Sequence, residues 1–177
     1  MSEYSEGQSA FRIGQMLSRE AALDKSLSAE RRNQKTNSAL EFFDQAIEKG
    51  YDEAQVFASR ASILSDLNYN IDALNYYNVA IAKNPEKASY FYDRALTKQS
   101  IFDYEGSLAD FEEAIRLSKL DNEDTRYWNE YAKQTGFKSA TQGYELDMQF
   151  LLQESEGLGK RIEILHEEKL KTIKRRK

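Results

Sequence analysis

The sequence predicts an all-α protein built from repeated antiparallel helix pairs. Only one proline and eight glycines occur in 177 residues, whereas a β-rich chain of this length needs many turns made from these residues. Apolar residues recur at i, i+4 and i+7 or i+8, which is the spacing of one helical face. The same short pattern returns after 34 residues. A fixed interval of this kind indicates helix pairs that stack into a solenoid.

Three segments carry the repeated pattern, with a small residue, Leu, an aromatic residue and Ala-Ile in the same order. They are residues 39–47, 73–81 and 107–115. The segments that precede the last two also match, because Phe57 aligns with Phe91 and Ala61 with Ala95. Small residues let helix axes approach closely while aromatic residues fill the remaining gaps. The register therefore predicts two helices in each repeat.

The predicted helices have chemical signals at their ends. Asn84-Pro85 should end a helix, because proline disfavours the α conformation in the residue before it. Asn70 or Asp72, and Asp103, are the candidate N-caps of the second helices. The predicted first helices are 54–66 and 88–101, and the predicted second helices are 70–83 and 104–118.

These residues resemble the tetratricopeptide repeat family, whose period is 34 residues. Unit 54–87 matches best, and unit 88–121 has Ser107 in place of Ala and Lys119 in place of Pro. Units 20–53 and 122–155 are degenerate copies. The resemblance implies an α-solenoid of antiparallel helix pairs, wound as a right-handed superhelix with a C-terminal capping helix. The motif residues are Phe57, Ala61, Ala73, Tyr77, Ala80, Pro85, Phe91, Ala95, Tyr104, Phe111 and Ala114.

The two ends of the chain depart from the repeat. We expect residues 1–9 to form a flexible N-terminus and 10–155 the repeat domain, in which a helix at 10–33 is a degenerate first helix or an N-terminal cap. Residues 155–159 should break the pattern before a capping helix at 156–177. Self-association through that helix is an alternative. Its basic end, 174–177, is either a solvated terminus or a contact for nucleic acid or anionic lipid.

Composition and charge limit the class of protein. Residues 156–177 carry a net charge of +4 and residues 1–155 a net charge of −9, so the body should repel nucleic acid. No apolar run is long enough for a transmembrane helix, and the acidic N-terminus does not resemble a signal peptide. The absence of cysteine excludes disulfides and suits a cytoplasmic protein.

No pattern in the sequence indicates catalysis, a cofactor or a metal. His166 is the only histidine, and its neighbours Glu167 and Glu168 point to different helix faces. The glycines do not cluster into a phosphate-binding loop, and residues 121–124 lack the glycine and the distal glutamate of a calcium loop. We therefore expect a non-catalytic scaffold or adaptor. A homo-oligomer built through the C-terminal helix and a nucleic-acid-associated accessory protein are the alternatives.

The resemblance also implies where a partner would bind. In this family the concave surface consists mainly of the first helices of the repeats, and a mixture of aromatic and polar groups there suits a peptide. Core packing or simple exposure is the competing interpretation for each residue. Ala58, Ser62, Tyr92 and Leu96 stand where one variant of the family clamps a chaperone's C-terminal carboxylate with Lys, Asn and Arg, so that specificity is not expected. The predicted partner-binding residues are Gln55, Ser62, Tyr92, Gln99, Arg126 and Lys133.

Overall fold

The computed structural model describes the backbone of residues 2–120 and 123–174, and the side chains of residues 2–120 and 125–157. Within these residues the protein has eight α-helices and no strand. No helix in this part of the chain has the length and apolarity needed to cross a membrane. The helices are α1 (Glu3–Leu23), α2 (Ala29–Glu48), α3 (Ala54–Asp66), α4 (Asn70–Lys83), α5 (Ala88–Ser100), α6 (Tyr104–Ser118), α7 (Glu123–Gln134) and α8 (Ala140–Lys174).

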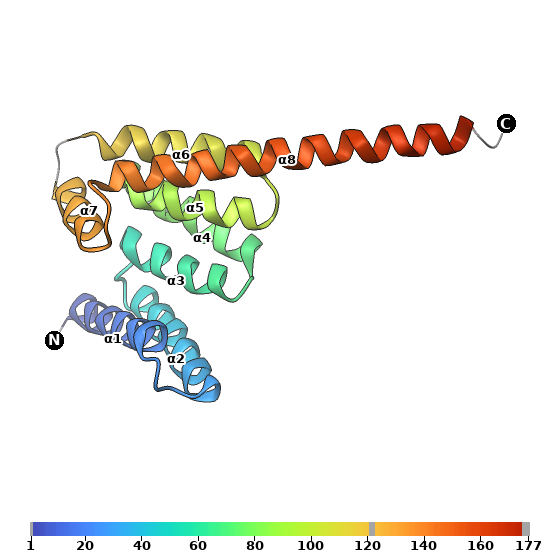
Figure 1. Ribbon diagram of the computed structural model, residues 1–177. Helices are drawn as coiled ribbons and strands as arrows, with labels where there is room; N and C mark the ends of the chain where they lie inside the picture. The colour runs from blue at the N-terminus through green and yellow to red at the C-terminus, as the bar shows by residue number, and fades with distance from the viewer. Residues whose placement is uncertain (1, 121–122, 175–177) are drawn as a thin grey trace.

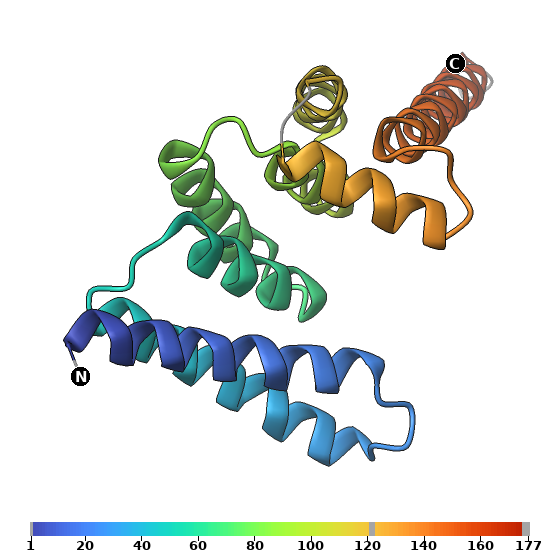
Figure 2. The ribbon, with the colours of Figure 1, turned by 90° about the vertical axis from the view of Figure 1, so that its left-hand side faces the viewer.

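The helices form successive antiparallel pairs that stack from the N-terminus to the C-terminus (Figure 1). Helices α1 and α2 form the first pair, α3 and α4 the second, and α5 and α6 the third. Figure 2 shows the pairs rising in order from α1–α2, with α7 and α8 at the far end. The all-α solenoid of helix pairs that the sequence predicted is confirmed.

The core follows the 34-residue register. The aromatic residues Phe43, Tyr77 and Phe111 occupy equivalent positions in α2, α4 and α6, and each is at most 2% exposed. Every small residue of the motif around them is fully buried. Full burial of one such aromatic side chain contributes roughly 1.5–3 kcal/mol. The fully buried small residues are Ala39, Ala46, Ala61, Ala73, Ala80, Ala95, Ser107 and Ala114.

Ser107 shows how a polar residue can occupy one of these positions. Its hydroxyl donates a hydrogen bond of 2.8 Å to the backbone carbonyl of Ala95 in the partner helix. A buried hydroxyl without a partner would cost about 1–3 kcal/mol, so this bond makes serine compatible with the core. The departure from alanine seen in the sequence therefore leaves the repeat geometry intact.

The register also appears in the turns and in the polar contacts. The turn inside each of three repeats contains a residue with a positive φ angle, and these residues are 34 positions apart. They are Asn68 at 63°, Phe102 at 64° and Gly136 at 95°. Arg60 of α3 pairs with Asp44 of α2, and Arg94 of α5 hydrogen-bonds Asn78 of α4 in the equivalent place. The second and third helix pairs are thus each joined to the preceding pair by an equivalent arginine contact.

The helix ends agree with most of the predicted signals. Helix α4 ends at Lys83 with Asn84 extended before proline, and the Asp103 side chain accepts a hydrogen bond from the Gly106 backbone N–H as the N-cap of α6. The prediction of Asn70 or Asp72 as an N-cap is wrong, because Tyr69 occupies the cap position of α4 without a side-chain bond. Asn70 already lies inside the helix.

The N-terminal predictions are wrong in two respects. Residues 1–9 were expected to be flexible, yet α1 begins at Glu3 and buries Gly7 against α2. The predicted helix at 10–33 ends at Leu23, because the Asp24 side chain accepts hydrogen bonds from Ser26 and Ser28 caps the start of α2. The first pair therefore spans 3–48 and does not start at residue 20.

The predicted break at 155–159 and the separate capping helix at 156–177 are also wrong. Helix α8 continues from Ala140 to Lys174, since a glycine inside a helix costs only about 1 kcal/mol relative to alanine and need not end it. The segment that covers α5 and α6 is the start of α8, where Ala140, Tyr144 and Leu151 are buried. The side chains of 158–177 lie outside the described residues.

Substitution of a close-contact alanine tests this packing. Ala80→Glu places a charge at a fully buried position between helices and should destabilise the protein by several kcal/mol. Ala82→Glu, on the exposed side of the same helix, is the matched control and should change stability by less than about 0.5 kcal/mol. Thermal and urea unfolding measure both variants, and equal melting temperatures would refute the packing described here.

Candidate functional site

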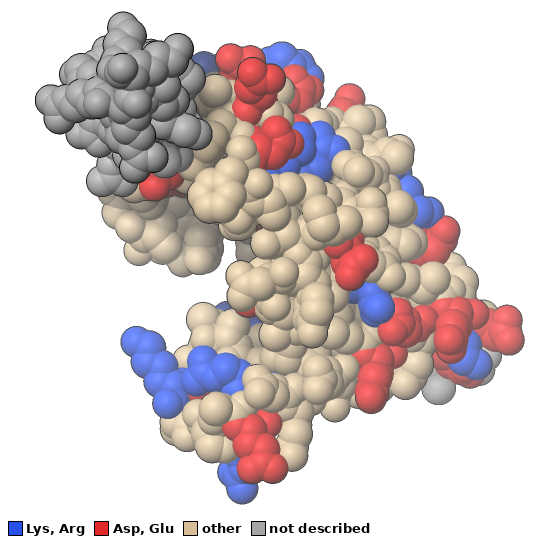
Figure 3. Space-filling model, turned by 90° about the vertical axis from the view of Figure 1, so that its right-hand side faces the viewer, with Lys and Arg blue, Asp and Glu red and all other residues tan. Residues whose placement is uncertain are grey.

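A large cleft lies on the inner side of the stack, between the two ends of the molecule. Its volume is about 1140 Å³, and side chains from α1, α3, α5 and α7 line it, with one contribution from α2. Figure 3 shows this hollow at the left edge of the view, between the α1–α2 end below and the α7–α8 end above. We call it the inner cleft. It is larger than most small-molecule pockets, which measure about 300–1,000 Å³.

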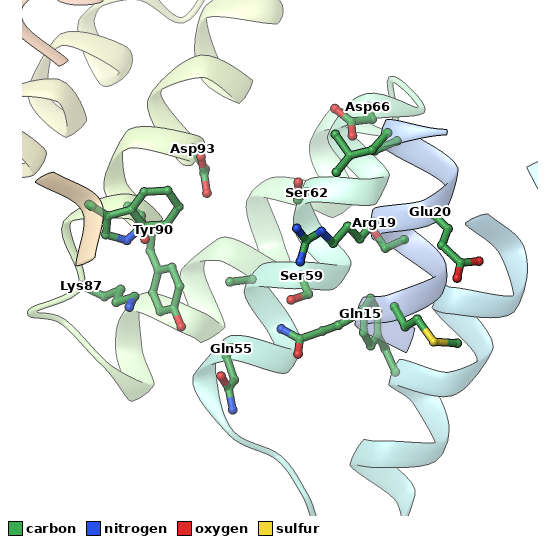
Figure 4. Close-up of a pocket in the computed structure, with 18 of the residues that line it drawn as sticks. Gln15, Arg19, Glu20, Gln55, Ser59, Ser62, Asp66, Lys87, Tyr90 and Asp93 are labelled. Carbon is green, nitrogen blue, oxygen red and sulfur yellow. The ribbon is translucent and has the colours of Figure 1, made fainter. Parts of the chain in front are cut away.

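Most of the residues that line the inner cleft have polar side chains. Gln15 and Arg19 extend from α1, Gln55 and Ser62 line the α3 wall, and Tyr90 lies on α5 (Figure 4). Carboxylates outnumber cations among the described lining residues, which suits a neutral or basic ligand. The charged lining residues are Arg19, Lys87, Glu20, Asp24, Asp66 and Asp93.

The order of the lining helices decides the type of repeat. The inner surface is built mainly from the first helices α1, α3 and α5, while α7 and α2 contribute one residue each and the second helices α4 and α6 contribute none. Together with the buried 34-residue register, this is the arrangement that the sequence resemblance implied. The fold is of the tetratricopeptide type.

Comparisons with known proteins give structural neighbours but no sequence relatives. No family model and no curated protein sequence matches the chain. The TPR domain of OM64 from Arabidopsis is 17% identical with a TM-score of 0.48, covering 71% of this chain and 98% of that one.

Two further neighbours have similar scores. The first TPR domain of Spaghetti (RPAP3), solved with an HSP90 peptide, is 15% identical with a TM-score of 0.48, covering 71% of this chain and 94% of that one. MamA is 15% identical with a TM-score of 0.48, and the alignment covers 89% of this chain and 87% of MamA. Because these scores are low, the tetratricopeptide-type assignment rests on the helix pairs and their register.

A second, smaller cavity lies beside the inner cleft, between α5, α7 and α8. Its volume is about 160 Å³, and we call it the α7 pocket. Ser89, Asp93 and Trp128 line both spaces, so the two share a wall. The other residues around the α7 pocket are Tyr92, Tyr131, Ala132, Thr135, Phe137, Ala140, Gly143, Tyr144 and Asp147.

Asp93 is the most perturbed acid at the shared wall. Its side chain is half-buried, and no hydrogen bond or ion pair to its carboxylate occurs within the described part of the chain. Burial, followed by repulsion from Asp66, raises the pKa of Asp93 to about 7. Partial desolvation also raises the pKa of Asp66. The tetratricopeptide-type cleft therefore contains a carboxylate that has no cationic partner among the described side chains.

The structure separates the six predicted binding residues. Gln55 and Ser62 line the inner cleft, and Tyr92 lines the α7 pocket. The Gln99 side chain donates a hydrogen bond of 3.0 Å to Glu154 of α8 and faces neither space. Arg126 and Lys133 are exposed on α7 outside both cavities, and Lys133 pairs with Glu130. The six residues do not share one surface.

The reason lies in the last helix pair of the tetratricopeptide-type stack. The prediction assumed that α7 follows α5 with the regular spacing, but α8 makes the main contact with α6 and also covers part of α5. Tyr92 consequently stacks on Tyr144, with ring centroids 4.4 Å apart, and its hydroxyl donates a hydrogen bond of 2.7 Å to Asp147. The sequence register alone does not predict that α8 covers α5 at this point, because the register gives no information on how one helix is oriented against another.

Other lining residues were missed for a different reason. Gln15, Ser18 and Arg19 come from α1, which the repeat register placed incorrectly. The serine and aspartate residues between positions 24 and 28 are a turn signal that could have located the end of α1. Asp93 was not predicted, because an acid on a helix face gives no sign of its burial.

The raised pKa of Asp93 makes stability depend on pH. Between pH about 4 and 7 the folded protein binds more protons at Asp93 than the unfolded chain does, so stability should fall as pH rises through that window. Asp93→Asn removes this loss and should stabilise the protein by up to about 4 kcal/mol at pH 8, with little effect at pH 4. Urea unfolding at both pH values measures the difference.

Glu112→Gln is the control for this measurement, because it removes the same charge from an exposed position on α6. It should have a similar small effect at both pH values. If Asp93→Asn destabilises the protein at pH 8, the carboxylate has a stabilising partner and this account is wrong.

Proposed function

We propose that this protein is a non-catalytic protein-interaction module, which binds an extended peptide segment of a partner in the inner cleft and acts as a scaffold or adaptor. The observation that carries the proposal is the cleft itself, which is open, combines polar side chains with apolar surface and is lined mainly by successive first helices of the repeats. Repeat solenoids create extended concave surfaces of this kind.

The chemistry of the lining residues supports peptide binding over small-molecule catalysis. Gln15, Gln55 and Ser62 supply donors and acceptors that can pair with a peptide backbone, and the half-buried Trp128 offers aromatic surface. Among the described residues that line the cleft there is no histidine or cysteine, and no lining serine is hydrogen-bonded to a basic side chain. The residues present are therefore suited to recognition.

Blocking the cleft tests the proposal. Peptides selected from a random display library on the full-length protein should bind with a measurable Kd in fluorescence anisotropy. Gln15→Trp places a bulky side chain in the cleft from an exposed position on α1 and should weaken those peptides at least tenfold. The loss follows from steric exclusion, so the unfolding temperature should remain unchanged.

Gln34→Trp is the matched control, because Gln34 is an exposed glutamine on α2 that does not line the cleft. It should bind the selected peptides like the unchanged protein. If no peptide is selected, or if both tryptophan variants bind equally well, the inner cleft is not a peptide site.

A second candidate is a homo-oligomer assembled through α8. The helix continues well beyond the body of the molecule in Figure 1, and its sequence there has an apolar stripe at Leu158, Ile162 and Leu165. If this stripe pairs between chains, light scattering should give a dimer or larger for the full chain and a monomer for residues 1–155. A monomer in both forms would contradict this candidate. The basic residues 174–177 lie outside the described side chains, and nucleic-acid binding through them stays an untested prediction.

A further inference from the structure

The α7 pocket combines aromatic walls with negative charge. On one side Tyr92 and Tyr144 stack with their planes 26° apart, and on another Trp128 and Tyr131 meet at 83° with centroids separated by 5.6 Å. Tyr131 is 51% exposed, so its ring is available to a ligand. The faces of aromatic rings are electron-rich, so a cavity lined by several such rings favours a cation.

The charged side chains described in the α7 pocket are all negative. Asp93 and Asp147 both line it, and none of its described lining residues is Lys, Arg or His. Burial raises the pKa of Tyr92 most, and the hydrogen bond to Asp147 and the negative charges of Asp147 and Asp93 raise it further. One oxygen of Asp147 accepts the Tyr92 hydrogen bond, and the described residues provide no partner for the carboxylate of Asp93. A cation is the missing partner of this arrangement.

The pocket has room for a side-chain head group. Its volume of about 160 Å³ is close to that of an engineered cavity, about 150 Å³, which accepts benzene. Gly143 of α8 lines the pocket, and a Cβ atom added there would meet nothing within 4 Å. The space beside Gly143 is therefore open and can be filled by substitution.

The rim of the pocket connects it to the inner cleft. Trp128 lines both spaces, and its indole Nε1–H is buried without an acceptor among the described residues. A peptide that lies in the inner cleft and passes Trp128 would direct one side chain between the aromatic walls.

From this geometry we propose that the α7 pocket binds the ammonium group of a lysine side chain of the partner peptide, between Asp93, Asp147 and the rings of Trp128 and Tyr131. The proposal rests on the peptide-binding function proposed above and specifies the chemistry of the bound segment. It assigns α7 and α8 a role in selecting the partner.

Lysine fits the acceptors better than the other cations of proteins. An ammonium group has three N–H donors on a compact centre and can contact two carboxylates from different helices. A methylated quaternary ammonium has no N–H to donate. The guanidinium of arginine pairs best with both oxygens of one carboxylate. Because one oxygen of Asp147 is already used by Tyr92, a guanidinium would pair in this way with Asp93 alone and would not bridge the two carboxylates.

A small probe tests the pocket without the partner. Trp128 is the only tryptophan in the chain, so its fluorescence reports directly on the pocket. n-Butylammonium chloride should cause a saturable change in Trp128 emission in the millimolar range, with NaCl matched throughout. Propylguanidinium should bind more weakly, and neutral 1-pentanol should not saturate. An equal response to butylammonium and pentanol, or tighter binding of propylguanidinium, would overturn the assignment.

Two sets of variants locate the binding. Asp93→Asn/Asp147→Asn should weaken butylammonium at least fivefold, whereas Glu130→Gln, which removes an exposed charge from α7, should not. Gly143→Leu should abolish binding by filling the pocket. Gly157→Leu, at an equally open glycine of α8 outside the pocket, is its control and should bind normally. Because leucine favours helix more than glycine does, neither leucine variant should lose stability. Normal binding of butylammonium by Gly143→Leu would contradict the proposal.

The peptide experiment separates this proposal from the function proposed above. In peptides selected on the full-length protein, one Lys→norleucine change should weaken binding at least fivefold, and this loss should disappear in Gly143→Leu. If selected peptides depend on Gln15 but contain no such lysine, the inner cleft binds peptides and the lysine pocket is wrong. If no peptide is selected yet butylammonium binds, the pocket remains and the peptide function fails.

Discussion

Fully buried small side chains bring the helices of this protein close together, and the remaining architecture depends on that contact. Ala61, Ala80 and Ala95 have no exposed surface, so any larger or charged residue would separate the helix axes. The aromatic residues at 43, 77 and 111 then fill the space between the pairs. Because one pair cannot bury its own apolar face, each repeat requires its neighbours.

This stacking positions the inner cleft. Repeating the same helix-pair contact places the first helices of successive pairs side by side, and the polar residues on their inner faces are left uncovered. The arginine contacts of Arg60 and Arg94 occur at equivalent places outside the cleft and fix the rotation of each pair against the preceding one. The cleft is thus a product of the repeat and needs no specialised loop.

The last helix pair packs differently from the others and changes the surface next to the cleft. Helix α8 covers α5 and α6 through Tyr144 and Leu151, and α7 lies across the beginning of α5. This irregular arrangement creates the α7 pocket and brings Asp93, Trp128 and Asp147 together. The same helix that closes the apolar core at the end of the stack therefore also forms a wall of the charged pocket.

The sequence by itself determined the helices of the middle repeats and their buried residues, because α3 to α6 follow a strict 34-residue register in which each position has one environment. It also located Gln55 and Ser62 on the inner surface. The start of α1, the continuity of α8 and the orientation of α7 were decided only by tertiary packing. These features depend on contacts between residues distant in sequence, such as Tyr92 with Asp147, and no local pattern records them.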